Sequence, residues 1–93
     1  MKIGLLRVDL LIPMCTSLKK KRSILKRQIH RLRTHYNVGV SEIGRNDAWK
    51  NAQLGIVTIN TRSHYIERAF KAILQELDQN GDIEVVETSI ELL

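Results

Sequence analysis

Positively charged side chains gather in one stretch of this chain, residues 17–36. The stretch contains eight Lys or Arg residues, and no Asp or Glu occurs from residue 13 to residue 41. Lysine and arginine neutralise the phosphates of nucleic acids, and this attraction supplies affinity that does not depend on base sequence. These residue types therefore predict binding to an anionic partner. The candidate contacts are Lys19, Lys20, Lys21, Arg22, Lys26, Arg27, Arg31 and Arg33.

The apolar residues of the same stretch recur at helical spacing. Steps of three, four and seven residues place Leu18, Leu25, Ile29, Leu32 and Tyr36 on one face of a helix. The basic residues fill the remaining surface in two bands. One band contains Lys19, Arg22, Lys26, His30 and Arg33, and the other contains Lys20, Arg27 and Arg31. Replacing Lys20, Lys21, Arg27 and Arg31 with Gln is expected to leave the fold intact, because these residues lie off the apolar face.

Charge is divided unevenly along the chain. The formal net charge is +5, yet residues 75–93 contain six acidic residues and no Lys or Arg. A basic end attracts phosphate or an acidic protein surface. Two partners follow from this division: a nucleic acid or another polyanion, and the acidic end of the same or a neighbouring copy.

Residues that could perform catalysis or bind a metal are scattered. Cys15, His30, His35 and His64 show none of the spacings that hold zinc, and His30 and His35 fall on different faces of the helix. We therefore expect no metal, no cofactor and no enzymatic activity. A small hydrolase of the acylphosphatase type is a remote alternative, because the loop at residues 13–17 lacks the glycines of an anion-binding cradle.

Six elements position these residues. Alternating apolar residues predict strands at residues 2–12, 38–43, 52–60 and 83–92. A second amphipathic helix begins at residue 61 or 63 and ends before Asn80-Gly81, and a turn-rich link spans residues 44–47. The order βαββαβ, with right-handed crossovers, predicts an α+β ferredoxin-like sandwich: a four-stranded antiparallel sheet with two helices on one face. We expect residues 1–93 to form one such domain.

The sheet face without helices must be solvated or paired with another molecule. Ile3, Leu5 and Leu11 are expected on it, with Leu54 or Ile56 as further candidates. Arg7 and Asp9 share a face of the first strand, where they could pair with cross-strand charges or with a subunit opposite. These apolar positions favour a homodimer. Trp49 is expected to anchor a loop or an interface.

Several segments together resemble the YlxP-like family of small bacterial proteins of unknown function. They are Leu6-Arg7, Ile12-Pro13, Ser17-Leu18-Lys19-Lys20-Lys21-Arg22, residues 37–42, Asp47-Ala48-Trp49 and Ala52-Gln53-Leu54-Gly55. Gly39 departs from the pattern, which has Ser or Ala there. The resemblance implies a ferredoxin-like fold and a cytoplasmic protein that is often encoded beside translation factors. Among polyanions it therefore favours RNA or a ribonucleoprotein such as the ribosome. It implies no catalytic residue.

Two functions remain open. The first is a non-enzymatic binding module whose basic helix contacts RNA or a ribonucleoprotein. The second is an assembly module, a homodimer whose basic helix docks on an acidic protein surface. The strands at residues 2–12 and 52–60 contain no aromatic residue, so RNA bases are not expected to stack on the sheet. No stretch approaches the roughly 20 apolar residues of a membrane span, and a cytoplasmic location is expected.

Overall fold

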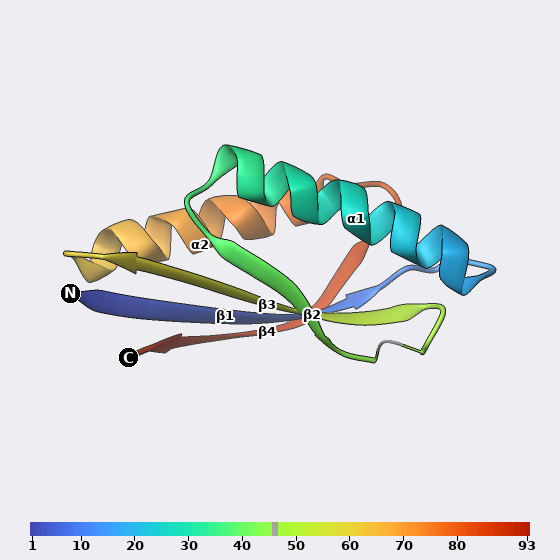
Figure 1. Ribbon diagram of the computed structural model, residues 1–93, viewed down its shortest axis with the longest axis horizontal. Coiled ribbons are helices and arrows are strands. Elements are labelled where there is room, and N and C mark those ends of the chain that lie inside the picture. The colour runs from blue at the N-terminus through green and yellow to red at the C-terminus, as the bar shows by residue number, and fades with distance from the viewer. Residues whose placement is uncertain (46) are drawn as a thin grey trace.

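The computed structural model describes residues 1–45 and 47–93 and contains four strands and two helices in the order βαββαβ (Figure 1). The elements are β1 (Lys2–Leu11), α1 (Leu18–His35), β2 (Gly39–Gly44), β3 (Asn51–Asn60), α2 (Ser63–Asp78) and β4 (Glu84–Leu92). The predicted element order is confirmed. Asn46, in the link expected at residues 44–47, lies outside the described residues.

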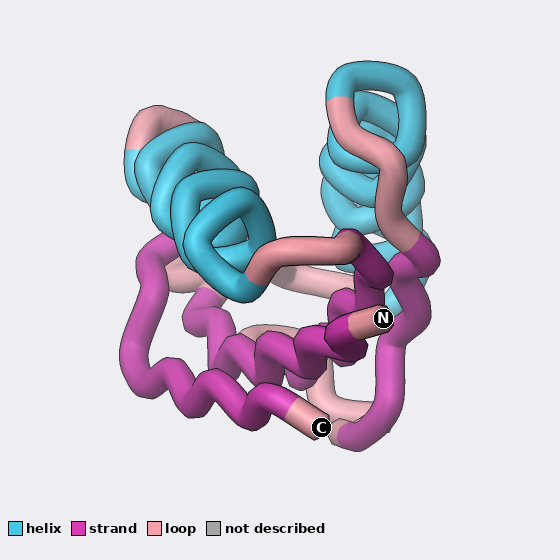
Figure 2. Tube along the Cα trace, turned by 90° about the vertical axis from the view of Figure 1, so that its left-hand side faces the viewer, coloured by secondary structure: helices cyan, strands magenta, loops and turns pink. Residues whose placement is uncertain are grey.

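The four strands form one antiparallel sheet in the order β2-β3-β1-β4. Both helices lie on one face of this sheet, and in the described part of the chain the opposite face carries no helix (Figure 2). α2 packs on β1, β3 and β4, whereas α1 packs mainly on β2. The predicted ferredoxin-like fold is therefore confirmed.

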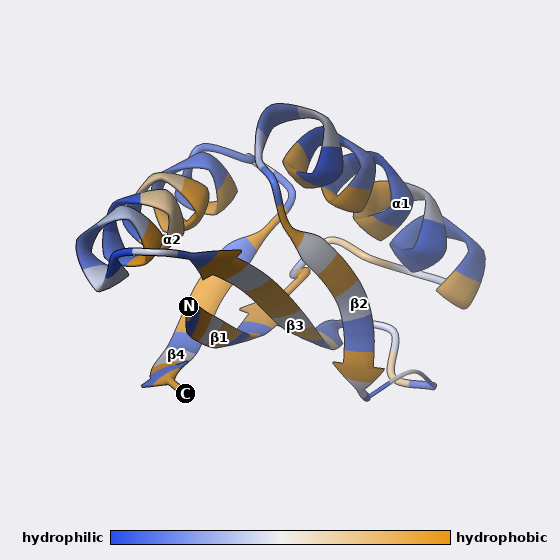
Figure 3. Cartoon of the chain, turned by 60° about the vertical axis from the view of Figure 1, so that its left-hand side comes forward, coloured by the Kyte–Doolittle hydropathy of each residue, from blue (hydrophilic) through white to orange (hydrophobic). Residues whose placement is uncertain are grey.

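The core fills the space between the sheet and the helices. Leu6 and Val8 of β1 point into it, and Phe70 and Ile73 of α2 meet them from above with no exposed surface. Figure 3 shows apolar residues on the inward side of α2, where four residues are buried at helical spacing. Gly4 lies beneath Ile66 and Phe70, so α2 approaches β1 closely at that point.

α1 buries a face that differs in part from the predicted one. Ser17 caps the helix by accepting a hydrogen bond from the Lys20 backbone amide. The buried residues are Lys21, Ile24, Leu25, Gln28 and Leu32. Leu18, Ile29 and Tyr36, predicted on the apolar face, are only half-buried. The buried face of α1 thus includes two polar residues, Lys21 and Gln28. The expectation that Lys21 lies off this face is wrong.

The sheet face opposite the helices, which we call the open face, differs from one expectation. Leu54 and Ile56 do not lie on it: they pair with Val8 and Leu6 and are buried beneath the helices. Strand register decides this placement, because residues directly opposite each other point to the same face. Val57 and Ile59 lie on the open face instead, opposite Leu5 and Ile3.

The described helices also bear on the question of membrane insertion. Neither α1 nor α2 combines the length and the apolar character that crossing a bilayer requires.

Candidate nucleic-acid interface

The cationic residues of α1 are mostly accessible to a partner. Seven of the eight predicted contacts are exposed: Lys19, Lys20, Arg22, Lys26, Arg27, Arg31 and Arg33. The helix has no acidic residue in its first turn that would offset them. Figure 3 shows the hydrophilic residues of α1 on its outward side, away from the sheet. The exposed surface of the helix is therefore strongly basic, as the sequence predicts.

Lys21 is the exception, and its side chain is 1% exposed. Its ammonium nitrogen lies 2.9 Å from Glu42 Oε2 and donates a hydrogen bond to the Arg45 carbonyl oxygen at 2.7 Å. Both partners belong to β2 or to the residue that follows it. Lys21 therefore ties α1 to β2, and we remove it from the candidate surface because its side chain is buried and already paired with Glu42.

One group of cations follows the side of α1 that is turned toward β2, and we call it the β2-side band: Lys19, Arg22, Lys26, His30 and Arg33. A groove lies between α1 and β2. The groove has a volume of about 360 Å³, and the last four of these residues line it. Its apolar lining comes from Leu25, Ile29 and Val40. Glu42 is the one acidic residue in this lining, and Lys21 already neutralises it. The groove consequently keeps its positive charge.

Arg33 is the most constrained member of the β2-side band. Its guanidinium donates a hydrogen bond to the Val40 carbonyl oxygen on β2. This bond fixes the side chain against the groove while its remaining donors stay available, because a guanidinium carries five N–H groups. Arg33 therefore both supports the groove and contributes charge to it.

The other cations face α2, and we call Lys20, Arg27 and Arg31 the α2-side band. Acidic residues lie near two of them, Arg27 and Arg31. Arg31 lies 3.8 Å from Glu76 Oε1, and His35 Nδ1 lies 3.0 Å from the same oxygen. Asp82 lines a cavity together with Arg27 and Arg31. This side of α1 is thus partly neutralised, whereas the β2 side is not.

The fold places the basic helix and the acidic residues of β4 at opposite edges of the sheet. α1 and its basic bands lie over β2, one edge strand, whereas Glu84, Glu87 and Glu91 belong to β4, the opposite edge strand. Glu87 and Glu91 pair with Asp9 and Leu5, so they lie on the open face. An anionic partner would therefore meet the α1–β2 edge first.

Other candidate chemistries find little support in the described residues. Cys15 is buried and donates from Sγ to the Ser17 carbonyl oxygen at 3.1 Å. In the loop after β1, the Cys15 backbone amide already donates to the Ile12 carbonyl oxygen. Within residues 1–45 and 47–93, no three His, Cys, Asp or Glu side chains come close enough to hold a metal ion. Trp49 is 53% exposed, which suits an interface better than a loop anchor.

Two polar residues near α1 were not singled out by the sequence. Gln28 is buried on the inner face of α1, and its Oε1 accepts a hydrogen bond from Asn80 Nδ2 at 2.8 Å. Gln28 lies four residues after Ile24 and four before Leu32, so its place on the buried face was readable from spacing. The sequence identifies Asn80 only as a residue that ends the second helix. Its hydrogen bond to Gln28 forms only because the fold brings the two residues together.

Comparison with known proteins gives the same fold and a family. The chain is 33% identical over 82 residues to the uncharacterized protein YlxP of Bacillus subtilis (strain 168), which covers 88% of this chain and 89% of that protein. A solved structure, the de novo designed protein Foldit4, aligns with a TM-score of 0.57 at 17% identity, covering 100% of this chain and 97% of that chain. This second likeness concerns the fold alone.

The family described as "Protein of unknown function (DUF503)" matches residues 3–90, which is nearly the whole chain. The match includes α1 and β2, the two elements that line the groove. Together with the likeness to YlxP, it confirms the resemblance seen in sequence: the chain belongs to the YlxP-like DUF503 family.

Proposed function

We propose that this protein is a non-enzymatic RNA-binding module that uses the β2-side band of α1. The observation that carries the proposal is the charge of the α1–β2 groove. This groove is lined by Arg22, Lys26, His30 and Arg33. Its one acidic residue, Glu42, forms an ion pair with Lys21. A concentration of uncompensated cations along one helix is the electrostatic footprint of a phosphate-binding surface.

Contacts to phosphates, rather than to bases, would dominate such binding. β1 and β3 form the centre of the sheet and contain no Phe, Tyr or Trp on which bases could stack. Binding would then depend on the shape and charge of the RNA and little on its sequence. The choice of RNA or a ribonucleoprotein follows from the resemblance to a family that is often encoded beside translation factors.

The test is a salt series of binding measurements by fluorescence anisotropy with a labelled RNA fragment. Four Lys or Arg residues in the band predict a slope of log affinity against log salt of about −3. The triple replacement of Lys19, Arg22 and Lys26 by Gln should reduce the magnitude of that slope by about 2 and weaken binding at low salt. Co-sedimentation with ribosomal particles gives a second readout of the same variant.

The matched control removes the same charge elsewhere. Arg62, Arg68 and Lys71 are exposed cations on or beside α2, and their replacement by Gln should leave the RNA affinity nearly unchanged. An equal loss in both triple variants would mean that net charge, and not the groove, attracts RNA. Wild-type protein that fails to bind RNA at low salt would overturn the proposal.

A second candidate function is assembly through the open face of the sheet. Ile43, Val57 and Ile59 are 43–54% exposed there, next to the half-buried Ile3 and Leu5. Arg7 and Asp9 lie on the same face, and Arg7 forms no ion pair among the described residues. A second copy related by two-fold symmetry would cover the apolar residues and place Arg7 near the partner subunit's acids. We therefore propose a homodimer as the occupant of this face.

Sedimentation velocity distinguishes a homodimer through the open face from an assembly in which the basic helix docks on acidic protein surface. Ile59→Lys should dissociate it, because a charge would be buried between the two sheets. Ile90→Lys is the matched control, since Ile90 is 48% exposed and pairs with Leu6 on the helix side of the sheet. A dimer that survives Ile59→Lys but dissociates at high salt would favour docking of the basic helix on acidic protein surface. A wild-type monomer at high concentration would rule out both arrangements.

A further inference from the structure

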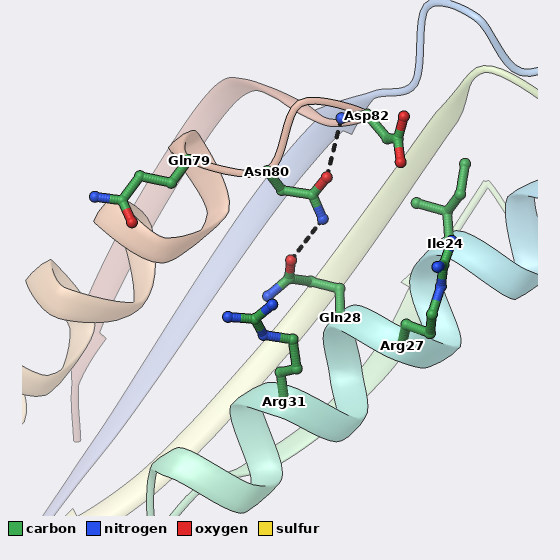
Figure 4. A pocket seen from close by; sticks show the side chains of 7 residues that line it. All are labelled: Ile24, Arg27, Gln28, Arg31, Gln79, Asn80 and Asp82. Atoms are coloured by element: carbon green, nitrogen blue, oxygen red, sulfur yellow. Dashed lines mark hydrogen bonds between the residues drawn. The ribbon is translucent and has the colours of Figure 1, made fainter.

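A cavity of about 280 Å³ lies between α1 and the connection from α2 to β4 (Figure 4). Arg27, Gln28 and Arg31 of α1 line one side, and Asn80 and Asp82 of the connection line the other. It is distinct from the groove on the β2 side of α1, with which it shares no lining residue. Its volume is several times the roughly 30 Å³ that one water molecule occupies.

A chain of hydrogen bonds fixes how the amides in this cavity are turned. The Asp82 backbone N–H donates to Asn80 Oδ1 at 2.9 Å, and a backbone N–H can only donate. Asn80 must therefore present Nδ2 on its other side, where it donates to Gln28 Oε1 at 2.8 Å. Gln28 in turn has its oxygen engaged, so its amide nitrogen is directed away from Asn80.

That amide nitrogen is a donor without an acceptor. Gln28 is 3% exposed, and its Nε2 has no hydrogen-bond partner among the described residues. Buried side-chain donors in proteins are nearly always paired, so an unpaired one calls for a missing partner. In Figure 4 the Gln28 nitrogen points toward the guanidinium of Arg31. Two donor groups thus face the same part of the cavity.

The remaining lining favours an anion as that acceptor. Arg27 and Arg31 add two guanidinium groups, and the contact from Arg31 to Glu76 is long, at 3.8 Å. Asp82 supplies the one carboxylate of the lining. Donors therefore outnumber acceptors, and planar guanidinium groups match the oxygens of phosphate with two parallel hydrogen bonds.

We propose that this cavity binds a phosphate group, whose oxygens accept from Gln28 Nε2 and from the Arg31 guanidinium, while Arg27 adds positive charge to the lining. The phosphate could belong to a free phosphate compound or to an RNA backbone. In both cases the chemistry of recognition is the same, and the site acts separately from the β2-side band.

Nuclear magnetic resonance of the side-chain amide of Gln28 tests the site directly. Its two N–H resonances are assigned by their loss in Gln28→Glu, a variant that keeps an oxygen for Asn80 but replaces the free donor with an acceptor. Titration of the wild-type protein with inorganic phosphate at constant ionic strength should move these resonances saturably. The Gln28→Glu variant, followed through its neighbouring backbone amides, should bind phosphate at least tenfold more weakly.

A second variant keeps the test valid if Gln28→Glu does not fold. Arg27 and Arg31 are exposed, so their joint replacement by Gln should preserve the fold and abolish the phosphate-dependent shift. The matched control replaces Arg22 and Lys26 by Gln and should leave that shift unchanged. Absence of a saturable shift in the wild-type protein, or an equal shift in the Arg27 and Arg31 variant, would overturn the site.

Titration with a short RNA separates the two sources of phosphate. A shift of the Gln28 resonances by RNA at lower concentration than by inorganic phosphate assigns the site to the RNA backbone. A shift by inorganic phosphate alone assigns it to a free phosphate compound. If RNA affinity falls only in variants of the β2-side band, while inorganic phosphate still shifts the Gln28 resonances, the cavity and the proposed RNA surface are independent sites.

Discussion

Replacing Lys21 with Gln should lower the free energy of unfolding by about 2–4 kcal/mol, because it leaves Glu42 without its cation in a largely buried place. Glu42 is 21% exposed, so the loss should stay below that of a fully enclosed pair. The variant also loses the hydrogen bond from the Lys21 ammonium to the Arg45 carbonyl oxygen, an acceptor that water can reach only in part. Urea unfolding, followed by circular dichroism, measures the change.

A double replacement separates the ion pair from packing. Lys21→Met combined with Glu42→Gln removes both charges and keeps most of the side-chain volume, so it should recover much of the lost stability. Lys20→Gln is the control, since Lys20 is exposed one residue away and its replacement should change the free energy of unfolding by less than about 0.5 kcal/mol. Equal stability of Lys21→Gln and Lys20→Gln would show that the buried pair does not hold α1 to β2.

Replacing Gly4 with Ala should destabilise the protein by about 1–3 kcal/mol through overpacking beneath α2. A Cβ atom at this position would clash with Ile66 Cγ2 and would come within 3.0 Å of Phe70 Cε2. Both neighbours are fully buried side chains in the core, so neither can move aside freely. Thermal unfolding, with a matched urea series, measures the loss.

Gly81→Ala is the matched control for this prediction. No atom lies within 4 Å of a Cβ built at Gly81, and no described glycine has a positive φ that an Ala would strain. Its free energy of unfolding should therefore stay close to that of the wild-type protein, or rise slightly because Ala restricts the unfolded chain. If Gly4→Ala proved as stable as Gly81→Ala, α2 would not pack on β1 as closely as the structure places it.

The Lys21 variants also bear on RNA binding at the α1–β2 groove. Lys21 offsets the negative charge of Glu42 at the edge of the α1–β2 groove, so its loss would leave that charge uncompensated in the groove. Lys21→Gln should therefore weaken RNA binding without Lys21 contacting RNA. The double replacement of Lys21 and Glu42 restores the charge balance, and it should restore RNA affinity as well.

Much of the architecture was readable from residue spacing. Alternation in β1 predicted Ile3 and Leu5 on the open face, and the order of elements predicted the sheet and its two helices. These inferences succeed because the periods of strands and helices are local properties of the chain. The assignment of Leu54 and Ile56 failed, because alternation gives two faces without saying which one the helices cover.

The sequence by itself determined the fold class, the basic character of α1 and the division of its cations into two bands. Only the tertiary structure decided which cations are free. Lys21 finds its partners in Glu42 and in Arg45, 24 residues away, and Gln28 finds Asn80, 52 residues away. The physical reason is that periodicity depends on near neighbours along the chain. Burial of a charge or an amide depends on groups that only folding brings within hydrogen-bond distance.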